Sequence, residues 1–203
     1  MKNILALSLA FLAMVPLARG AVIYSGVQNL GVPQSPDGLY LNVFSGATAG
    51  AQPGSWNTAP WLNPFFGGVY IATDDLFLPV ITGADQIVNL AAGTMIDGSS
   101  TFATAESGST THVGGGPLQF QLATPGYMGF AFRQTVAGPV YYGWLQLTIN
   151  NASAGTIKDW AYESVAGVGI VTGVPEPGRA LLLFFGMFIT FFRRKRRVSP
   201  AVW

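Results

Sequence analysis

Short runs of alternating hydrophobic and polar residues, broken by Gly, Pro and Asn, fill most of the chain between residues 21 and 173. No long stretch repeats its apolar residues at the three- to four-residue spacing of an amphipathic helix. The pattern therefore predicts an all-β fold, an antiparallel β-sandwich of jelly-roll-like form. The early predicted strands cover residues 39–44, 68–73, 85–90 and 117–123, the last with the cleanest alternation.

The strongest β signal lies between residues 126 and 164. Two turn-rich linkers divide it, which predicts a three-stranded antiparallel meander inside a two-sheet sandwich. The small residues Gly129 and Ala131 alternate with the large ones of the first strand, so its second face is either thinly packed or covered by bulky neighbours. Alternation groups Met128, Phe130 and Phe132, then Leu145, Leu147 and Ile149, then Lys158, Trp160 and Tyr162 opposite Ile157, Asp159, Ala161 and Glu163.

Two turn-rich regions, residues 46–67 and 94–112, are expected to be surface loops. The first carries Trp56 and Trp61, which suggest two roles. They can form an aromatic platform for stacking sugars, or they can close the end of the sandwich, which is the interpretation we favour.

Composition narrows the possible chemistry. The chain contains no Cys, which excludes disulfides, thiolate metal sites and a Cys nucleophile. Between residues 21 and 173 only Arg133 and Lys158 are basic, against eight acidic residues, so this body has a net charge near −6. An acidic body argues against binding to a phosphate backbone, and no nucleic-acid partner is expected.

The N-terminal segment, residues 1–20, has the order of a secretory signal peptide. Lys2 is followed by an uncharged apolar stretch over residues 4–18 and by small residues at Ala18 and Gly20. Cleavage after Gly20 would release the body, residues 21–173, outside the cytoplasm.

The C-terminal segment, residues 174–203, combines three features. The sequence VPEP, Val174, Pro175, Glu176 and Pro177, precedes a predicted transmembrane helix over residues 178–192. Its thirteen uncharged residues, 180–192, would rise about 20 Å, short of a hydrocarbon core of about 30 Å, so flanking arginines must snorkel. The following basic run predicts that the tail stays in the cytoplasm: Arg193, Arg194, Lys195, Arg196 and Arg197.

This order of motif, apolar segment and basic cluster resembles the PEP-CTERM sorting signal of exported bacterial proteins. The resemblance covers about the last twenty-five residues and departs from the family pattern in a short apolar segment and in the extension VSPAVW. It implies transient anchoring by inner-membrane lipids, recognition of VPEP by an exosortase, cleavage nearby and delivery to the cell surface or extracellular matrix. Glu176 would then be part of a substrate and not a catalyst.

The body also resembles the C-terminal part of β-rich domains found ahead of such signals. The matching residues are 126–132, Tyr142-Gly143-Trp144 and residues 159–163. This second resemblance implies a sandwich and no defined activity.

Few residues suggest catalysis. His112 is the chain's one histidine, no G-x-S-x-G elbow accompanies it, and a solvated loop position is expected. Asp74 and Asp75 are adjacent on a predicted strand end, so their side chains diverge, and a solvated strand end is preferred over a calcium or acid–base site. Asp159 and Glu163 are expected to be surface charges.

The leading hypothesis is an exported surface or matrix protein without catalytic activity, metal or cofactor. The alternative is a carbohydrate-binding module or adhesin that holds extracellular polysaccharide on Trp56 and Trp61. A third possibility is a hydrolase that uses carboxylates of the body.

Overall fold

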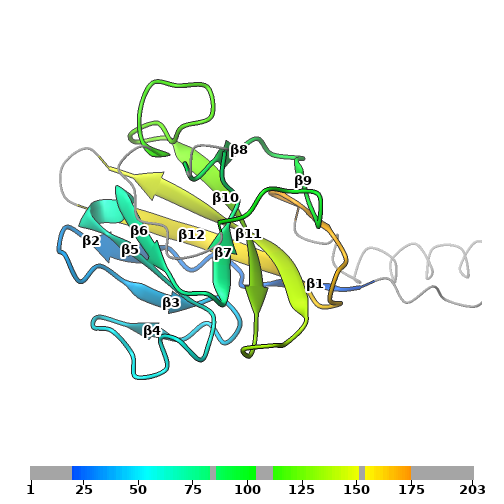
Figure 1. Ribbon diagram of the computed structural model, residues 1–203. Coiled ribbons are helices and arrows are strands. Elements are labelled where there is room, and N and C mark those ends of the chain that lie inside the picture. Colours follow the sequence, from blue (N-terminus) through cyan, green and yellow to red (C-terminus); the bar gives the residue numbers. More distant parts are fainter. Residues whose placement is uncertain (1–19, 83–85, 104–111, 151–153, 175–203) are drawn as a thin grey trace, which may run out of the picture.

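The computed structural model describes residues 20–82, 86–103, 112–150 and 154–174. This part of the chain is all-β with antiparallel sheets, and it includes a short 3-10 turn, η1 (Phe66–Gly68) (Figure 1). The strands are β1 (Val22–Tyr24), β2 (Leu30–Pro33), β3 (Tyr40–Asn42), β4 (Thr48–Ala49), β5 (Trp61–Phe65), β6 (Tyr70–Thr73), β7 (Phe77–Pro79), β8 (Asn89–Leu90), β9 (Met95–Ile96), β10 (Pro125–Arg133), β11 (Val140–Ile149), β12 (Ala154–Glu163) and β13 (Ile170–Val171).

The larger sheet has the order β1-β12-β11-β10-β7, with β2 also pairing β12 and β8 also pairing β10. Its centre is formed by β10, β11 and β12, which are neighbours in both the chain and the sheet. The predicted three-stranded meander is confirmed.

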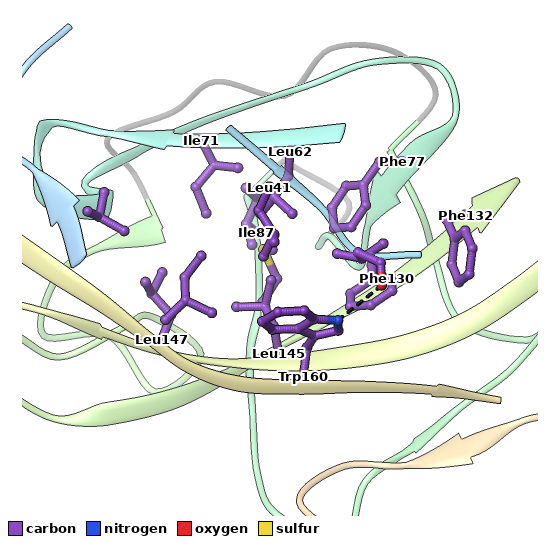
Figure 2. Close-up of a cluster of buried hydrophobic side chains, with 14 of the residues drawn as sticks. Leu41, Leu62, Ile71, Phe77, Ile87, Phe130, Phe132, Leu145, Leu147 and Trp160 are labelled. Carbon is purple, nitrogen blue, oxygen red and sulfur yellow. Dashed lines mark hydrogen bonds between the residues drawn. The ribbon is translucent and has the colours of Figure 1, made fainter. Parts of the chain in front are cut away.

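A second sheet, of order β4-β3-β5-β6, packs against one face of the larger one. Figure 2 shows their side chains meeting, with Leu41, Leu62 and Ile71 of the small sheet opposite residues of β10, β11 and β12. The indole N–H of Trp160 on β12 donates to the backbone carbonyl of Val43, 3.0 Å away, and so joins the two layers. The predicted inward groups Met128, Phe130, Phe132 and Leu145, Leu147, Ile149 all lie in this core.

A β-bulge at Lys158 changes the alternation of β12. Gln146 is opposite Asp159 and Leu147 is opposite Ile157, so Lys158 has no partner in the β11–β12 register. The bulge adds one residue to β12, which turns Ile157 to the same core as Trp160 and Tyr162. The grouping of Lys158 with Trp160 and Tyr162 was therefore wrong, and Lys158 is exposed.

The opposite face of the larger sheet is covered by the β9–β13 pair. Ile96 and Ile170 pack there with Trp144 and with the small Ala131 and Ala161. The second face of β10 is thus covered by bulky neighbours, the second of the two alternatives for Gly129 and Ala131. Both faces of the meander are buried, and Figure 1 shows β10 to β12 between the β3–β6 layer and the β9 region.

Local predictions were wrong for residues 117–123 and for parts of both expected surface loops. Residues 117–123 form no strand, only the single bridges Val113↔Phe120 and Leu122↔Ile149. Phe120 is buried, but Leu118 and Leu122 are 52% and 47% exposed, so their apolar side chains do not reach the core. Conversely, β5 lies inside the first region expected to be a loop, where antiparallel pairing with β3 and β6 holds it extended. β9 lies inside the second, residues 94–112, where it pairs with β13 and Ile96 is fully buried.

Among the described residues no helix has the length and apolar character needed to cross a membrane. The predicted signal peptide, apart from Gly20, the residues after Val174 and the helix over residues 178–192 lie outside the described residues.

Candidate functional site

A charged cleft opens beside β7 and the end of β10. It consists of two adjoining cavities of about 180 and 520 Å³ that share Asp75, Leu76 and Arg133 in their walls. The smaller cavity is also lined by Leu78, Gly98, Phe102, Ala131, Phe132, Val140 and Tyr142. The larger one is also lined by Asn57, Val136, Ala137 and Gly138.

The backbone holds the two charged residues of the cleft in fixed positions. Asp75 lies in the turn between β6 and β7, and Arg133 is the last residue of β10. Because β7 pairs with β10, the turn lies beside the strand end, and the Arg133 N–H donates to the Leu76 carbonyl at 2.9 Å. Two residues that are 58 positions apart in the sequence therefore share one cleft.

The two cavities are lined by different segments. Phe102 and Tyr142 line the smaller cavity, where their rings stack with centroids 5.8 Å apart and planes 20° apart. The larger cavity is bordered by the β10–β11 turn, where Val136 is 67% exposed. Ala137 in this turn has φ 117, a positive value that an L side chain rarely adopts.

The charges of the cleft do not pair with each other. Among the described residues the one ion pair joins Lys158 Nζ and Asp159 Oδ2, 3.9 Å apart. Arg133 and Asp75 thus line the same two cavities without a salt bridge. Asp75 is exposed and Arg133 is half-buried, so solvent and any small solute can reach them.

Asp74, next to Asp75, points into the protein. The expected solvated position was wrong, because Asp74 is 1% exposed. Burial raises the pKa of its carboxyl to about 7, although the N–H of Leu76, 2.9 Å from Oδ1, partly stabilises the charged form. Its Oδ2 has no hydrogen-bond partner in the described structure. The expected divergence of Asp74 and Asp75 is confirmed, which places the two carboxyls in different environments.

Asp159 and Glu163 are also buried, at 5% and 4% exposure, so the expected surface position was wrong for both. After the bulge both side chains lie on the face of β12 away from the main core, and β1 pairs alongside β12 in the same sheet. The Tyr24 hydroxyl donates to Asp159 Oδ2 at 2.8 Å, and burial together with this neighbour raises the pKa of Tyr24 to about 12. Glu163 Oε1 accepts from the Val165 N–H at 3.1 Å. Each carboxylate thus accepts a hydrogen bond, although Asp159 Oδ1 has no hydrogen-bond partner in the described structure.

His112 is fully buried, so the expected solvated loop position was wrong. Its Nε2 lies 3.0 Å from the Gly68 carbonyl oxygen, and its ring meets Phe120 edge-on at 6.0 Å. The histidine therefore joins its loop to η1. No group of three His, Cys, Asp or Glu able to hold a metal ion occurs among the described residues.

Trp56 and Trp61 are 8% and 7% exposed and pack with Tyr40. Tyr40 and Trp61 lie on β3 and β5 of the small sheet, on the face away from the main core, and the Trp61 indole N–H donates to Ser55 Oγ at 3.1 Å. The pair thus covers the outer face of the small sheet and not the end of the sandwich. A stacking platform needs exposed ring faces, so these exposures favour the packing role.

Of the predicted sorting motif, Val174 is described and is 48% exposed, whereas Pro175, Glu176 and Pro177 lie outside the described residues. The basic run, Arg193 to Arg197, lies outside them as well. No family model matches the chain, and neither the comparison with curated proteins nor that with solved structures found a match.

The cleft was missed from the sequence. Its one available signal was Arg133, one of only two basic residues in an acidic body. Nothing local in the sequence placed Asp75 beside it, because β7 and β10 come together only in the folded sheet.

Proposed function

We propose that this chain is an exported bacterial cell-surface or extracellular-matrix protein with a non-catalytic β-sandwich body. Its C-terminal signal anchors the precursor in the inner membrane with the body outside the cytoplasm, and an exosortase recognises and cleaves it. The observation that carries the proposal is the order VPEP, apolar segment and five consecutive basic residues at one end of the chain, with a signal-peptide pattern at the other.

The body is compatible with this role. The first described strand begins at Val22 and the last ends at Val171, within the expected limits of residues 21–173. Val174, where the motif begins, is 48% exposed, so a processing enzyme has access to this position. The jelly-roll-like arrangement stays a prediction, since β10, β11 and β12 follow one another as a meander within one sheet.

The proposal is tested by expressing the full chain in a host that has an exosortase and measuring the intact mass of the mature protein. The wild type is expected to lose both end segments and to leave the inner membrane. A variant lacking residues 174–177 is expected to keep its C-terminal segment and to stay in the membrane fraction. A matched control lacks residues 198–201, an equal length beyond the basic run, and is expected to be processed like the wild type.

The predicted orientation has its own measurement. A reporter fused after Trp203 is expected to be active in the cytoplasm when the motif is deleted and the segment stays in place. Identical mass and location for the wild type and the motif deletion would refute the sorting role, and a periplasmic reporter would refute the membrane orientation.

A further inference from the structure

We propose that the charged cleft between β7 and the β10–β11 turn binds a small zwitterion, an α-amino acid with an apolar side chain. The cleft presents one cationic and one anionic side chain, Arg133 and Asp75, in the walls of two adjoining cavities. The two groups form no salt bridge with each other, so both charges are open to a solute.

The two charges decide the class of ligand. A simple anion would be attracted by Arg133 but repelled by Asp75. A simple cation would be attracted by Asp75 but repelled by Arg133. A neutral solute would leave both charges partly desolvated and without a charged partner. A ligand that carries an ammonium and a carboxylate on the same carbon satisfies both side chains at once. The Arg133 guanidinium donates parallel N–H groups to the carboxylate, and the Asp75 carboxylate accepts N–H groups from the ammonium.

The smaller cavity decides the rest of the ligand. Leu76 and Leu78 line it together with the stacked rings of Phe102 and Tyr142. Its volume of about 180 Å³ admits an aliphatic side chain, and Asp75 and Arg133 also line the adjoining cavity of about 520 Å³. An apolar side chain therefore enters the smaller cavity while the two charged groups stay at Asp75 and Arg133.

The segments that carry Asp75 and Arg133 are joined to each other in the absence of any ligand. The N–H of Arg133 donates to the Leu76 carbonyl at 2.9 Å, which ties the strand end to the turn that carries Asp75. The β7–β10 pairing continues from this point through Phe132↔Phe77. Rigid placement reduces the ordering that binding would otherwise require.

The experiment is isothermal titration calorimetry of the full chain in detergent with L-leucine and three analogues. The compound 4-methylpentanoate lacks the ammonium, 3-methylbutylamine lacks the carboxylate, and glycine lacks the side chain. Leucine is expected to bind, and each charge-deleted analogue is expected to bind about tenfold more weakly, as for loss of a charged hydrogen bond. Glycine is expected to lose at least about tenfold, because it buries no apolar side chain.

Variants locate the binding. Asp75→Asn is expected to bind leucine and 4-methylpentanoate equally, and Arg133→Gln is expected to bind leucine and 3-methylbutylamine equally. Asp37→Asn and Lys158→Gln serve as matched controls, since both side chains are exposed and line neither cavity, and they are expected to keep the wild-type preference.

Three results would overturn the proposal: no heat of binding with leucine at millimolar concentration, analogues that bind the wild type as well as leucine does, or variants that keep the full preference. Circular dichroism reports whether each variant is folded, and the analogue series on the wild type decides the question even if a variant is not. The sorting experiment above is independent of this outcome.

Discussion

Replacing Asp74 by Asn is expected to change how the stability of the body depends on pH. Asp74 is 1% exposed at the start of the β6–β7 turn, and its Oδ2 has no hydrogen-bond partner in the described structure. Asn has almost the same shape, keeps a carbonyl oxygen that can accept from the Leu76 N–H and carries no charge. The substitution therefore removes the charge with little change in volume.

The magnitude follows from the raised pKa. Burial lifts the carboxyl from 3.8 to about 7, and each pKa unit corresponds to about 1.4 kcal/mol. In the wild type the folded state holds this proton between pH 4 and 7 while the unfolded state has lost it, so stability falls as pH rises through this window. The loss is at most about 4 kcal/mol, complete above pH 7 and absent below about pH 4. At neutral pH the Asn variant avoids this loss and is more stable by that amount. The buried amide N–H₂ that replaces Oδ2 has no partner, which lowers this advantage by about 1–3 kcal/mol.

The assay is urea unfolding followed by tryptophan fluorescence at a series of pH values between 4 and 8. The free energy of unfolding of Asp74→Asn minus that of the wild type is expected to rise by up to about 4 kcal/mol across this range. The exposed Asp37→Asn serves as the control and is expected to stay within about 0.5 kcal/mol of the wild type. A difference between Asp74→Asn and the wild type that does not vary with pH would refute the reasoning, because it would mean that the buried carboxyl is ionised throughout.

Three further substitutions test the packing. Trp160→Phe is expected to destabilise the protein by about 1–3 kcal/mol, because it deletes the hydrogen bond to the Val43 carbonyl that joins the two sheets. Thermal unfolding measures the loss of stability, and an unchanged midpoint would contradict this role. Gly143→Ala is expected to lower stability by about 1–3 kcal/mol in the same assay, since a Cβ there would overlap the ring of Phe130. An unchanged stability would mean that the ring moves aside freely. Trp56→Ala is expected to lower stability by about 3–5 kcal/mol and to leave the binding profile on a glycan array unchanged. Loss of a glycan signal without loss of stability would instead support the sugar-stacking role of Trp56.

The alternation of side chains was enough to predict the centre of the fold. A strand exposes successive residues to opposite faces, so a period of two can be recognised locally, and it correctly grouped Phe130 with Phe132 and Leu145 with Leu147. The same rule failed at Lys158, because a bulge is set by pairing with the neighbouring strand. It also failed at residues 117–123, where alternation is clear but no neighbouring strand continues the ladder.

The burial of polar residues depended on the tertiary structure. Asp74, His112, Asp159 and Glu163 were all expected to be solvated, yet each is under a tenth exposed. Their burial follows from contacts with distant parts of the chain, such as the Tyr24 side chain of β1, which hydrogen-bonds Asp159.

The all-β class, the order of the central meander and the exclusion of Cys chemistry could be predicted from the sequence, since they depend on composition and on neighbours one or two residues apart. Which charged residues line the same cleft depends on the folded sheet. Asp75 and Arg133 share the cleft because β7 pairs with β10, and this pairing of distant segments is selected by the packing of the whole core and not by the residues that carry the charge.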